Sequence, residues 1–202
     1  MPKQQWKPST ILNPVPVVMV SCADKKGKPN IITIAWTGTI NSEPPMLSIA
    51  VRPERFSHAI LCDRKQFVVN LVTRSLLRAA DFCGVRSGRD LDKFAATGLT
   101  PAPASSVEAP LIEESPVNIE CAVKKIIPLG SHDLFLSEIT AVNVDEGLVD
   151  PKGRLRLDRA GLVCYNHGEY FALLGRALGY FGYSVRKRKK LKRNMKKAPR
   201  KK

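Results

Sequence analysis

Short apolar runs rich in β-branched side chains dominate the first 75 residues of the chain. Residues 15–21 (VPVVMVS) and 31–35 (IITIA) flank the segment DKKGKPN, whose glycine, proline and asparagine are typical of turns. This pattern predicts a β-hairpin. Further strands are expected at 46–51 (MLSIAV) and 67–72 (FVVNLV), with a short helix at 58–64 between them.

The middle of the chain is predicted to be a helical insert followed by a surface connection. Between residues 73 and 94 the period of two is lost, and LLRAADF has apolar spacings that fit one or two helical turns. Gly84 is expected to end this helix. The segment GLTPAPASSVEAP, residues 98–110, is rich in Pro, Ala and Ser and is expected to run over the surface.

The last third of the body returns to the strand pattern at 117–123 and 134–144. Residues 162–174 (LVCYNHGEYFALL) fit either a strand or a helix, since so short an apolar run does not reveal its period, and a strand entering a loop is preferred. Many short strands favour a mainly β fold, a closed barrel or sandwich, over a parallel α/β sheet. The phosphate-binding motif GxxxxGK[ST] and the dinucleotide-binding motif GxGxxG do not occur in the chain. Any nicotinamide nucleotide is therefore expected to bind transiently, as a substrate.

Composition supports one globular domain in 202 residues, with 44% hydrophobic and 25% charged residues. No apolar run reaches the length of a membrane span, and the start MPKQQWKPST lacks the apolar core of a secretory signal, so a cytoplasmic location without a transmembrane segment is expected. The five cysteines are widely spaced and form no CxxC pair, which indicates reduced, mostly buried thiols. A metal site is not expected.

Most of the positive charge is concentrated at the end of the chain. Arg186 to Lys202 contains 12 Lys or Arg residues and no acid, and without this run the formal net charge falls from +15 to +3. We therefore divide the chain into a folded domain, residues 1–185, and a basic, disordered tail, residues 186–202. The tail is either a solubilising extension or a nonspecific contact for RNA, DNA or anionic lipid.

Three polar segments offer groups that suit an anionic ligand with an aromatic ring. PNIITIAWTGT brings an indole together with small polar residues near a strand end, AVRPERFSH follows an apolar strand with guanidinium and hydroxyl groups, and CGVRSGRDLDKF is a charged loop that contains glycine. The candidate residues are Asn30, Trp36 and Thr37 in the first segment, Arg52, Arg55 and Ser57 in the second, and Ser87, Arg89 and Lys93 in the third. The alternative for the first segment is a tryptophan in the core. The alternative for the second is a solvated turn, and for the third a surface loop with salt bridges.

These segments belong to a longer ordered series of motifs. In chain order they are PVVMVSCADKKGKPNIITIAWTG, EPPMLSIAVRPERFSH, FVVNL, DFCGVRSGRDLDKF, APLIEESPVNIEC, GSHDLFLSEI and YNHGEYF. From Pro14 to Tyr183 this series resembles the flavin reductase-like, flavoredoxin-type FMN proteins. The resemblance implies an FMN-binding split β-barrel, a Greek-key barrel of about six antiparallel strands with helical additions. It also implies a homodimer with FMN near the subunit interface.

The resemblance also assigns expected roles to individual residues. Asn30, Trp36 and Thr37 would lie beside the flavin ring, and Ser57 would face the cofactor where relatives often have Thr. The other residues expected at the cofactor are Lys93, His132 and Tyr165, the last in a place where some relatives have Phe. Lys93 or a protonated His132 would stabilise negative charge on reduced flavin, whereas His58 and His167 are expected to be structural.

Three functions follow as hypotheses. The first is an NAD(P)H-dependent flavin (FMN) reductase, in which the cofactor ring carries the hydride chemistry and the protein supplies position and field. The second is an electron carrier of the flavoredoxin type, with tightly held FMN that a protein partner reduces. The third is a polyanion-binding protein that acts through the basic tail.

Overall fold

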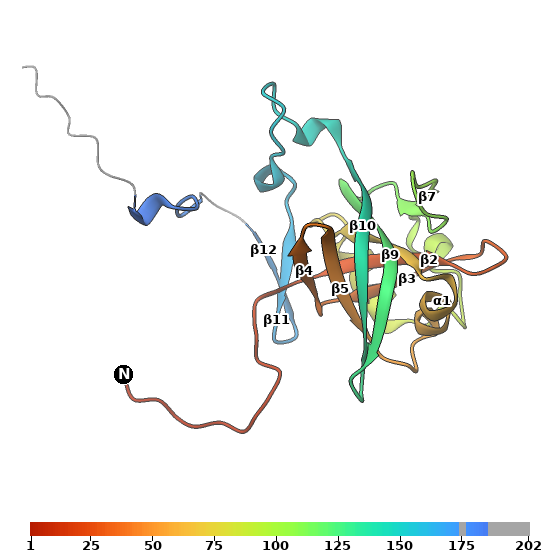
Figure 1. The fold of residues 1–202 in the computed structure, drawn as a ribbon, viewed down its shortest axis with the longest axis horizontal. Helices are drawn as coiled ribbons and strands as arrows, with labels where there is room; N and C mark the ends of the chain where they lie inside the picture. The colour runs from red at the N-terminus through yellow and green to blue at the C-terminus, as the bar shows by residue number, and fades with distance from the viewer. Residues whose placement is uncertain (174–176, 186–202) are drawn as a thin grey trace, which may run out of the picture.

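The computed structural model describes residues 1–173 and 177–185. The predicted basic tail, residues 186–202, lies outside the described residues, so the division of the chain after residue 185 stays a prediction. The body of the molecule is a barrel-like sheet with helices packed on one side, and the N-terminal residues extend away from it (Figure 1).

Seven antiparallel strands form the main sheet, in the order β3-β2-β6-β9-β10-β5-β4. Their bounds are β2 (Val18–Ala23), β3 (Pro29–Ile34), β4 (Thr37–Ser42), β5 (Pro45–Val51), β6 (Gln66–Leu71), β9 (Val117–Pro128) and β10 (Asp133–Val144). Every strand expected within residues 15–144 is present, and the predicted mainly β fold is confirmed. The sequence pattern did not reveal β4, because five of its six residues are exposed at the edge of the sheet and show no apolar run.

Smaller elements surround this sheet. A three-stranded sheet joins β1 (Val15–Pro16), β11 (Val163–Asn166) and β12 (Glu169–Ala172), and a two-stranded ladder joins β7 (Pro101–Ala102) and β8 (Leu111–Ile112). The α-helices are α1 (Phe56–Arg64), α2 (Leu77–Val85) and α3 (Lys93–Thr97), and the 3₁₀ turns are η1 (Glu146–Leu148), η2 (Leu157–Arg159) and η3 (Tyr183–Val185). The strand preferred within residues 162–174 is confirmed, and it continues into a hairpin. His167 and Gly168 form its turn, both with positive φ, as two-residue hairpin turns often require.

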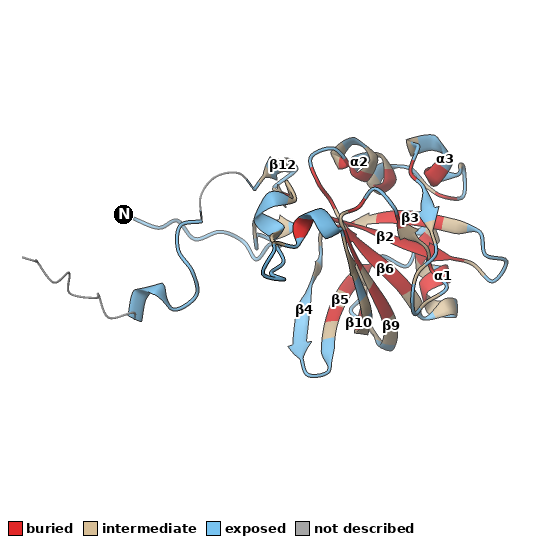
Figure 2. Cartoon of the chain, turned by 90° about the horizontal axis from the view of Figure 1, so that it is seen from above, coloured by how far each residue is buried: buried red, intermediate tan, exposed pale blue. Residues whose placement is uncertain are grey.

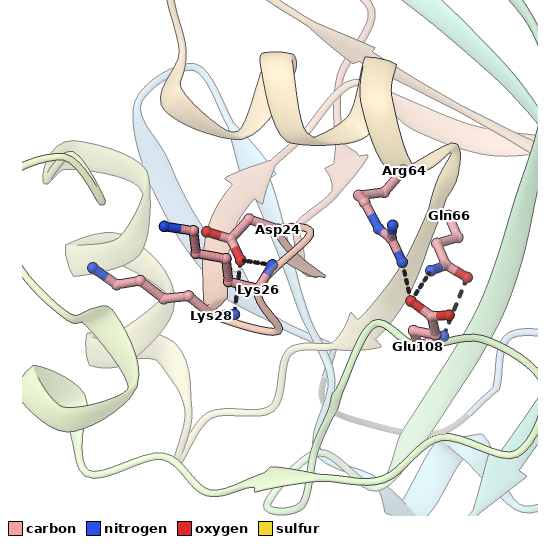
Figure 3. Close-up of polar contacts among 6 residues, drawn as sticks. All are labelled: Asp24, Lys26, Lys28, Arg64, Gln66 and Glu108. Atoms are coloured by element: carbon pink, nitrogen blue, oxygen red, sulfur yellow. Dashed lines mark hydrogen bonds and ion pairs between the residues drawn. The ribbon is translucent and has the colours of Figure 1, made fainter.

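The predicted first hairpin is confirmed as β2 paired with β3, from Val18 opposite Ile34 to Ala23 opposite Pro29. Its turn is closed by Asp24, whose carboxylate accepts hydrogen bonds from the backbone N–H groups of Lys26 and Lys28 at 2.8 and 2.9 Å (Figure 3). The turn is therefore held by an acidic side chain at its first position as well as by the residues that the sequence pattern singled out.

Strand β2 is buried on both faces and separates two apolar cores. Val18, Val20 and Cys22 point into the barrel, whereas Val17 and Met19 pack toward α2 and α3. Figure 2 shows this buried strip running through the middle of the sheet beneath the helices. The alternation of a strand with period two thus supplies side chains to both cores at once.

Helix α2 differs from its prediction at its C-terminal end. Gly84 does not end the helix, which continues to Val85. A Cβ atom at position 84 would lie 3.3 Å from the Cβ of Thr33, so the glycine allows α2 to pack closely on β3. The helix insert also continues further than expected, because Asp92 caps α3 by accepting a hydrogen bond from the backbone N–H of Ala95 at 3.1 Å.

The connection at residues 98–110 runs over the surface, as expected, and is anchored by acidic side chains. Glu108 contacts both Arg64 and Gln66 at the junction of α1 and β6 (Figure 3). Deeper in the molecule, Glu120 accepts hydrogen bonds from the backbone N–H groups of Ser105 and Ser106 at 2.8 and 2.6 Å. These contacts hold the connecting loop against the barrel.

Candidate functional site

A groove on the side of the barrel consists of two adjoining pockets of about 510 and 370 Å³. The two pockets share Ile32, Arg52 and Arg55. The larger one is walled by the β5–α1 turn and by the loop between α2 and α3, and the smaller one by the end of β3 and by residues from β5, β11 and the β9–β10 turn. Segments far apart in the sequence therefore meet in one groove.

One end of the groove is strongly cationic. Its lining contains the basic side chains of Arg52, Arg55, Arg86, Arg89 and Lys93, against one acidic side chain, that of Glu54. Glu54 lies 3.5 Å from Arg52 and so neutralises part of this charge. The remaining excess of positive charge favours an anionic ligand.

Backbone contacts hold the arginines in place at this end. Arg55 Nη1 donates to the carbonyl of Gly84 at 3.2 Å, and Arg89 Nη2 donates to the carbonyl of Glu54 at 3.4 Å. Ser87 accepts a hydrogen bond from the backbone N–H of Arg89 at 3.2 Å. Arg55 thus joins the β5–α1 turn to the end of α2, and Arg89 joins the α2–α3 loop to the same turn.

Lys93 is the buried cation of the groove, with 4% of its surface exposed. Its Nζ donates to the carbonyls of Ile31 and Cys83, each at 2.7 Å. Among the described residues no carboxylate pairs with it. Burial lowers the pKa of Lys93, and the positive charge of Arg55 acts in the same direction, so the free protein does not fully compensate this charge.

Asn30 lies beneath the groove wall and does not line it. It is buried, and its Nδ2 donates to Ser57 Oγ at 2.7 Å, which orients the hydroxyl that does line the groove. Gly88 covers Asn30 so closely that a Cβ at position 88 would lie 2.0 Å from Asn30 Oδ1 and 2.9 Å from a ring carbon of Phe56. The α2–α3 loop can therefore approach the barrel only with glycine at this position.

The other end of the groove is aromatic. The rings of Trp36 and His132 lie 4.6 Å apart at an interplanar angle of 39°, and Tyr165 lines the same pocket. Burial lowers the pKa of His132, and the positive charge of Arg52 acts in the same direction, which favours the neutral form of the imidazole.

Nine of the eleven residues predicted for the site line this groove: Trp36, Arg52, Arg55, Ser57, Ser87, Arg89, Lys93, His132 and Tyr165. Thr37 lies outside it. Its hydroxyl donates to the carbonyl of Ser48 at 2.8 Å, and it lines a separate, apolar pocket of about 460 Å³ that also contacts Trp36. Arg86 and Phe56 line the groove without having been assigned, although Arg86 stands in the same charged loop as Ser87 and Arg89.

The other polar candidates lie outside the groove. His58 Nε2 lies 2.8 Å from Asp133 Oδ2, and its ring packs edge-on against Phe135, a contact between α1 and β10.

All five cysteines are unpaired, and three of them are buried. Across residues 1–173 and 177–185, no group of His, Cys, Asp and Glu is placed to hold a metal ion. Within the same residues, no helix has the length and apolar character needed to cross a bilayer.

The structure is thus a small β-barrel protein with a groove that is cationic at one end and aromatic at the other. Comparison with known proteins identifies the family. The model of the flavin reductase like domain matches residues 12–173, and the chain belongs to that family. The predicted family is thereby confirmed, and a flavin is the cofactor that this family implies.

Individual relatives agree with this assignment. Flavoredoxin of Desulfovibrio vulgaris (Miyazaki F) superimposes with a TM-score of 0.85 at 31% identity, over 91% of this chain and 100% of that chain. An FMN-binding protein from Thermus thermophilus shares the fold, with a TM-score of 0.71 at 24% identity over 85% of this chain and 94% of that one. An uncharacterised protein of Archaeoglobus fulgidus is 32% identical over 125 residues, which are 62% of this chain and 71% of that protein.

Proposed function

We propose that this chain binds FMN in the groove, with the phosphate at the cationic end and the ring beside Trp36. The observation that carries this proposal is the division of one continuous groove into an end with five basic side chains and an end with three ring side chains. FMN has the same division, a phosphate dianion at one end and a planar ring at the other. The FMN-binding relative from Thermus thermophilus supports this choice of flavin.

The residues present fit such a cofactor. Arg52, Arg55 and Arg89 offer guanidinium donors for phosphate oxygens, and Ser57 and Ser87 offer hydroxyl groups. Lys93 supplies a buried positive charge and has used two of its three N–H groups on backbone carbonyls. An anion in the groove would compensate that charge, which the free protein leaves without a carboxylate partner among the described residues.

The protein's own part in the reaction is positioning and electrostatics. The flavin supplies the capacity to accept a hydride or electrons. Trp36 and His132 would place ring side chains beside the flavin, and the imidazole is held by a hydrogen bond between Nδ1 and Ser131 Oγ at 2.9 Å. Lys93 and the arginines keep positive charge near the site, which favours a reduced and more negative ligand.

We infer that the reaction is NAD(P)H-dependent flavin reduction. The family description supports this class of activity. The test is an anaerobic titration of the FMN-loaded protein with NADH and, separately, with NADPH. The absorbance band of oxidised flavin, at roughly 450 nm, is the readout. Rapid bleaching by either nucleotide is expected. A protein that binds FMN but is bleached by neither nucleotide would contradict this inference.

The second candidate function is an electron carrier that a protein partner reduces. The observation that favours it is the likeness to the Desulfovibrio vulgaris flavoredoxin, which is covered over its whole length at 31% identity. The same titration separates the two functions. A carrier would keep FMN through gel filtration and accept electrons from a reduced redox protein, while NADH and NADPH would leave its spectrum unchanged.

A homodimer is the proposed assembly. Its support is the family resemblance, together with apolar surface next to the groove. Trp36 is 45% exposed, and the apolar pocket beside it is lined by Leu12, Val15 and Leu134. Such surface is typical of a protein interface. Light scattering after gel filtration should give twice the chain mass.

A further inference from the structure

The cationic end of the groove carries more positive charge than one phosphate group needs. Five basic side chains against one acidic side chain give its lining a net charge of +4. The phosphate monoester of FMN carries about two negative charges at neutral pH. With FMN bound, about two positive charges would therefore stay uncompensated, which favours a second anionic group at this end.

Arg86 differs from the other basic side chains of this end in its contacts. The other four, those of Arg52, Arg55, Arg89 and Lys93, each contact a carboxylate or a backbone carbonyl. Across residues 1–173 and 177–185, no hydrogen bond or ion pair engages the guanidinium of Arg86, which is exposed and lines the groove directly after α2. Its N–H groups are thus available to a ligand.

The acidic side chain of the same end is already engaged. Glu54 lies 3.5 Å from Arg52 in an ion pair. In nucleotide-binding proteins a carboxylate commonly binds the ribose 2′-hydroxyl of NADH, whereas an arginine accommodates the 2′-phosphate of NADPH. An available guanidinium beside an engaged carboxylate therefore matches the phosphorylated nucleotide better.

We propose that Arg86 binds the 2′-phosphate of NADPH, so that the chain selects NADPH over NADH. The inference rests on the proposed flavin reduction and names its electron donor. A guanidinium can donate two parallel hydrogen bonds to a phosphate group, and NADH has only a hydroxyl at that position. FMN would use the other arginines, the two serines and Lys93, which leaves Arg86 to the transiently bound nucleotide.

Isothermal titration of the FMN-loaded full chain with NADP⁺ and, separately, with NAD⁺ tests this assignment. The oxidised nucleotides transfer no hydride to oxidised flavin, so affinity is measured apart from turnover. NADP⁺ should bind about tenfold more tightly than NAD⁺. Arg86→Gln should weaken NADP⁺ binding about tenfold and leave the NAD⁺ affinity close to that of the parent chain.

The matched control is Arg78→Gln. Arg78 is an exposed arginine on α2 that lies outside the lining of both pockets of the groove. This variant removes the same charge from the same region of the chain, so it should keep the preference for NADP⁺. An equal loss of preference in both variants would mean that general attraction, and not a contact with Arg86, selects the nucleotide.

Two further outcomes would overturn the assignment. One is equal affinity of the parent chain for NADP⁺ and NAD⁺. The other is a weaker FMN affinity in Arg86→Gln with the nucleotide preference unchanged, because Arg86 would then serve the flavin phosphate.

Flavin bleaching separates this inference from the proposed function. A chain that prefers NADP⁺ but is bleached by neither NADPH nor NADH would retain the nucleotide site and lose the reductase function. Bleaching by both nucleotides, with no preference in binding, would retain the reductase function and remove the role of Arg86.

Discussion

The fold stabilises the charges of two buried residues, Glu120 and Lys93, to different extents. Burial opposes the charge of Glu120, but hydrogen bonds from Ser106, Ser105 and Asn143 outweigh it and lower the pKa of the carboxyl to about 2. Lys93 has two carbonyl partners, and burial still lowers its pKa. A lowered pKa stabilises the charge of an acid and destabilises the charge of a base.

The two residues therefore differ in how far the protein itself compensates their buried charges. Glu120 faces Ser105 and Ser106 in the connecting loop, so its negative charge is satisfied within the protein and holds that loop in place. Lys93 lines the groove. Its positive charge is only partly compensated there, and an anionic ligand would complete the compensation.

The largest expected effect comes from removing the buried charge of Lys93, which the protein only partly compensates. Lys93→Met should raise the dissociation constant for FMN by about a hundredfold, because the phosphate loses a buried positive partner. Fluorescence quenching of FMN during titration with protein measures it. Lys125→Met, at an exposed lysine of β9, is the control and should leave the affinity unchanged. Unchanged affinity in Lys93→Met would show that this lysine belongs with Glu120 as a purely structural group.

Glu120→Gln should affect stability and spare the ligand. The amide cannot accept all the hydrogen bonds that the carboxylate receives from Ser105, Ser106 and Asn143, so the free energy of unfolding at neutral pH should fall by about 2 kcal/mol. Urea denaturation measures this loss. FMN affinity should stay at the parent value, and a tenfold weaker affinity would contradict the separation of the two regions.

Acid denaturation checks the same carboxylate through its proton. Because the folded pKa of Glu120, about 2, lies below its ordinary value of 4.5, the stabilisation is present above pH 4.5 and is lost as the pH falls toward 2. The gap in unfolding free energy between the parent chain and Glu120→Gln should therefore narrow across this range. A gap that stays constant would mean that the charge of Glu120 contributes nothing.

The aromatic end of the groove should have a smaller effect than Lys93. Trp36→Ala should weaken FMN binding about tenfold, since a stacked ring contact of this kind is worth on the order of 1 kcal/mol beyond its buried area. Trp6→Ala, at the other tryptophan of the chain, is 71% exposed on the N-terminal segment and provides the matched control. Equal loss in both variants would place the ring away from Trp36.

The smallest expected effect concerns the loop that carries the cationic end. Gly88→Ala puts a methyl group into Asn30 and Phe56, so the loop must shift and FMN affinity should fall about fivefold. Gly38→Ala, where a Cβ would meet nothing within 4 Å, is the control. Isothermal titration of both variants tests this, and an unaffected Gly88→Ala would mean that the loop position does not matter for the ligand.

The sequence predicted the strands, the family and most of the groove because those features are local or ordered along the chain. The hairpin of β2 and β3 follows from two β-branched runs and their turn. The residues at the cationic end stand in two short segments that both contain Arg and Ser, and the second also contains Gly. The prediction that α2 ends at Gly84 was wrong, because the glycine serves close packing against Thr33. Thr33 lies on β3, 51 positions earlier in the chain.

The two buried charges were beyond prediction for a similar reason. Glu120 stands in a strand pattern without any sign of its role, and its partners come from a loop and from Asn143 on β10. Lys93 lines the groove, as its place in the charged loop suggested, but its carbonyl partners on Ile31 and Cys83 depend on how α2 and α3 pack on β3. Contacts between distant segments set the electrostatics of both groups.

A comparison of FMN with riboflavin tests the central claim most directly, because the two ligands differ only in the phosphate. Isothermal titration of the ligand-free chain with each compound should give FMN a dissociation constant about a hundredfold lower, from charge-assisted bonds at the cationic end. The Lys93→Met variant should lose most of that difference. Equal affinities for the two compounds, or no binding of either, would contradict the assignment of the groove to FMN.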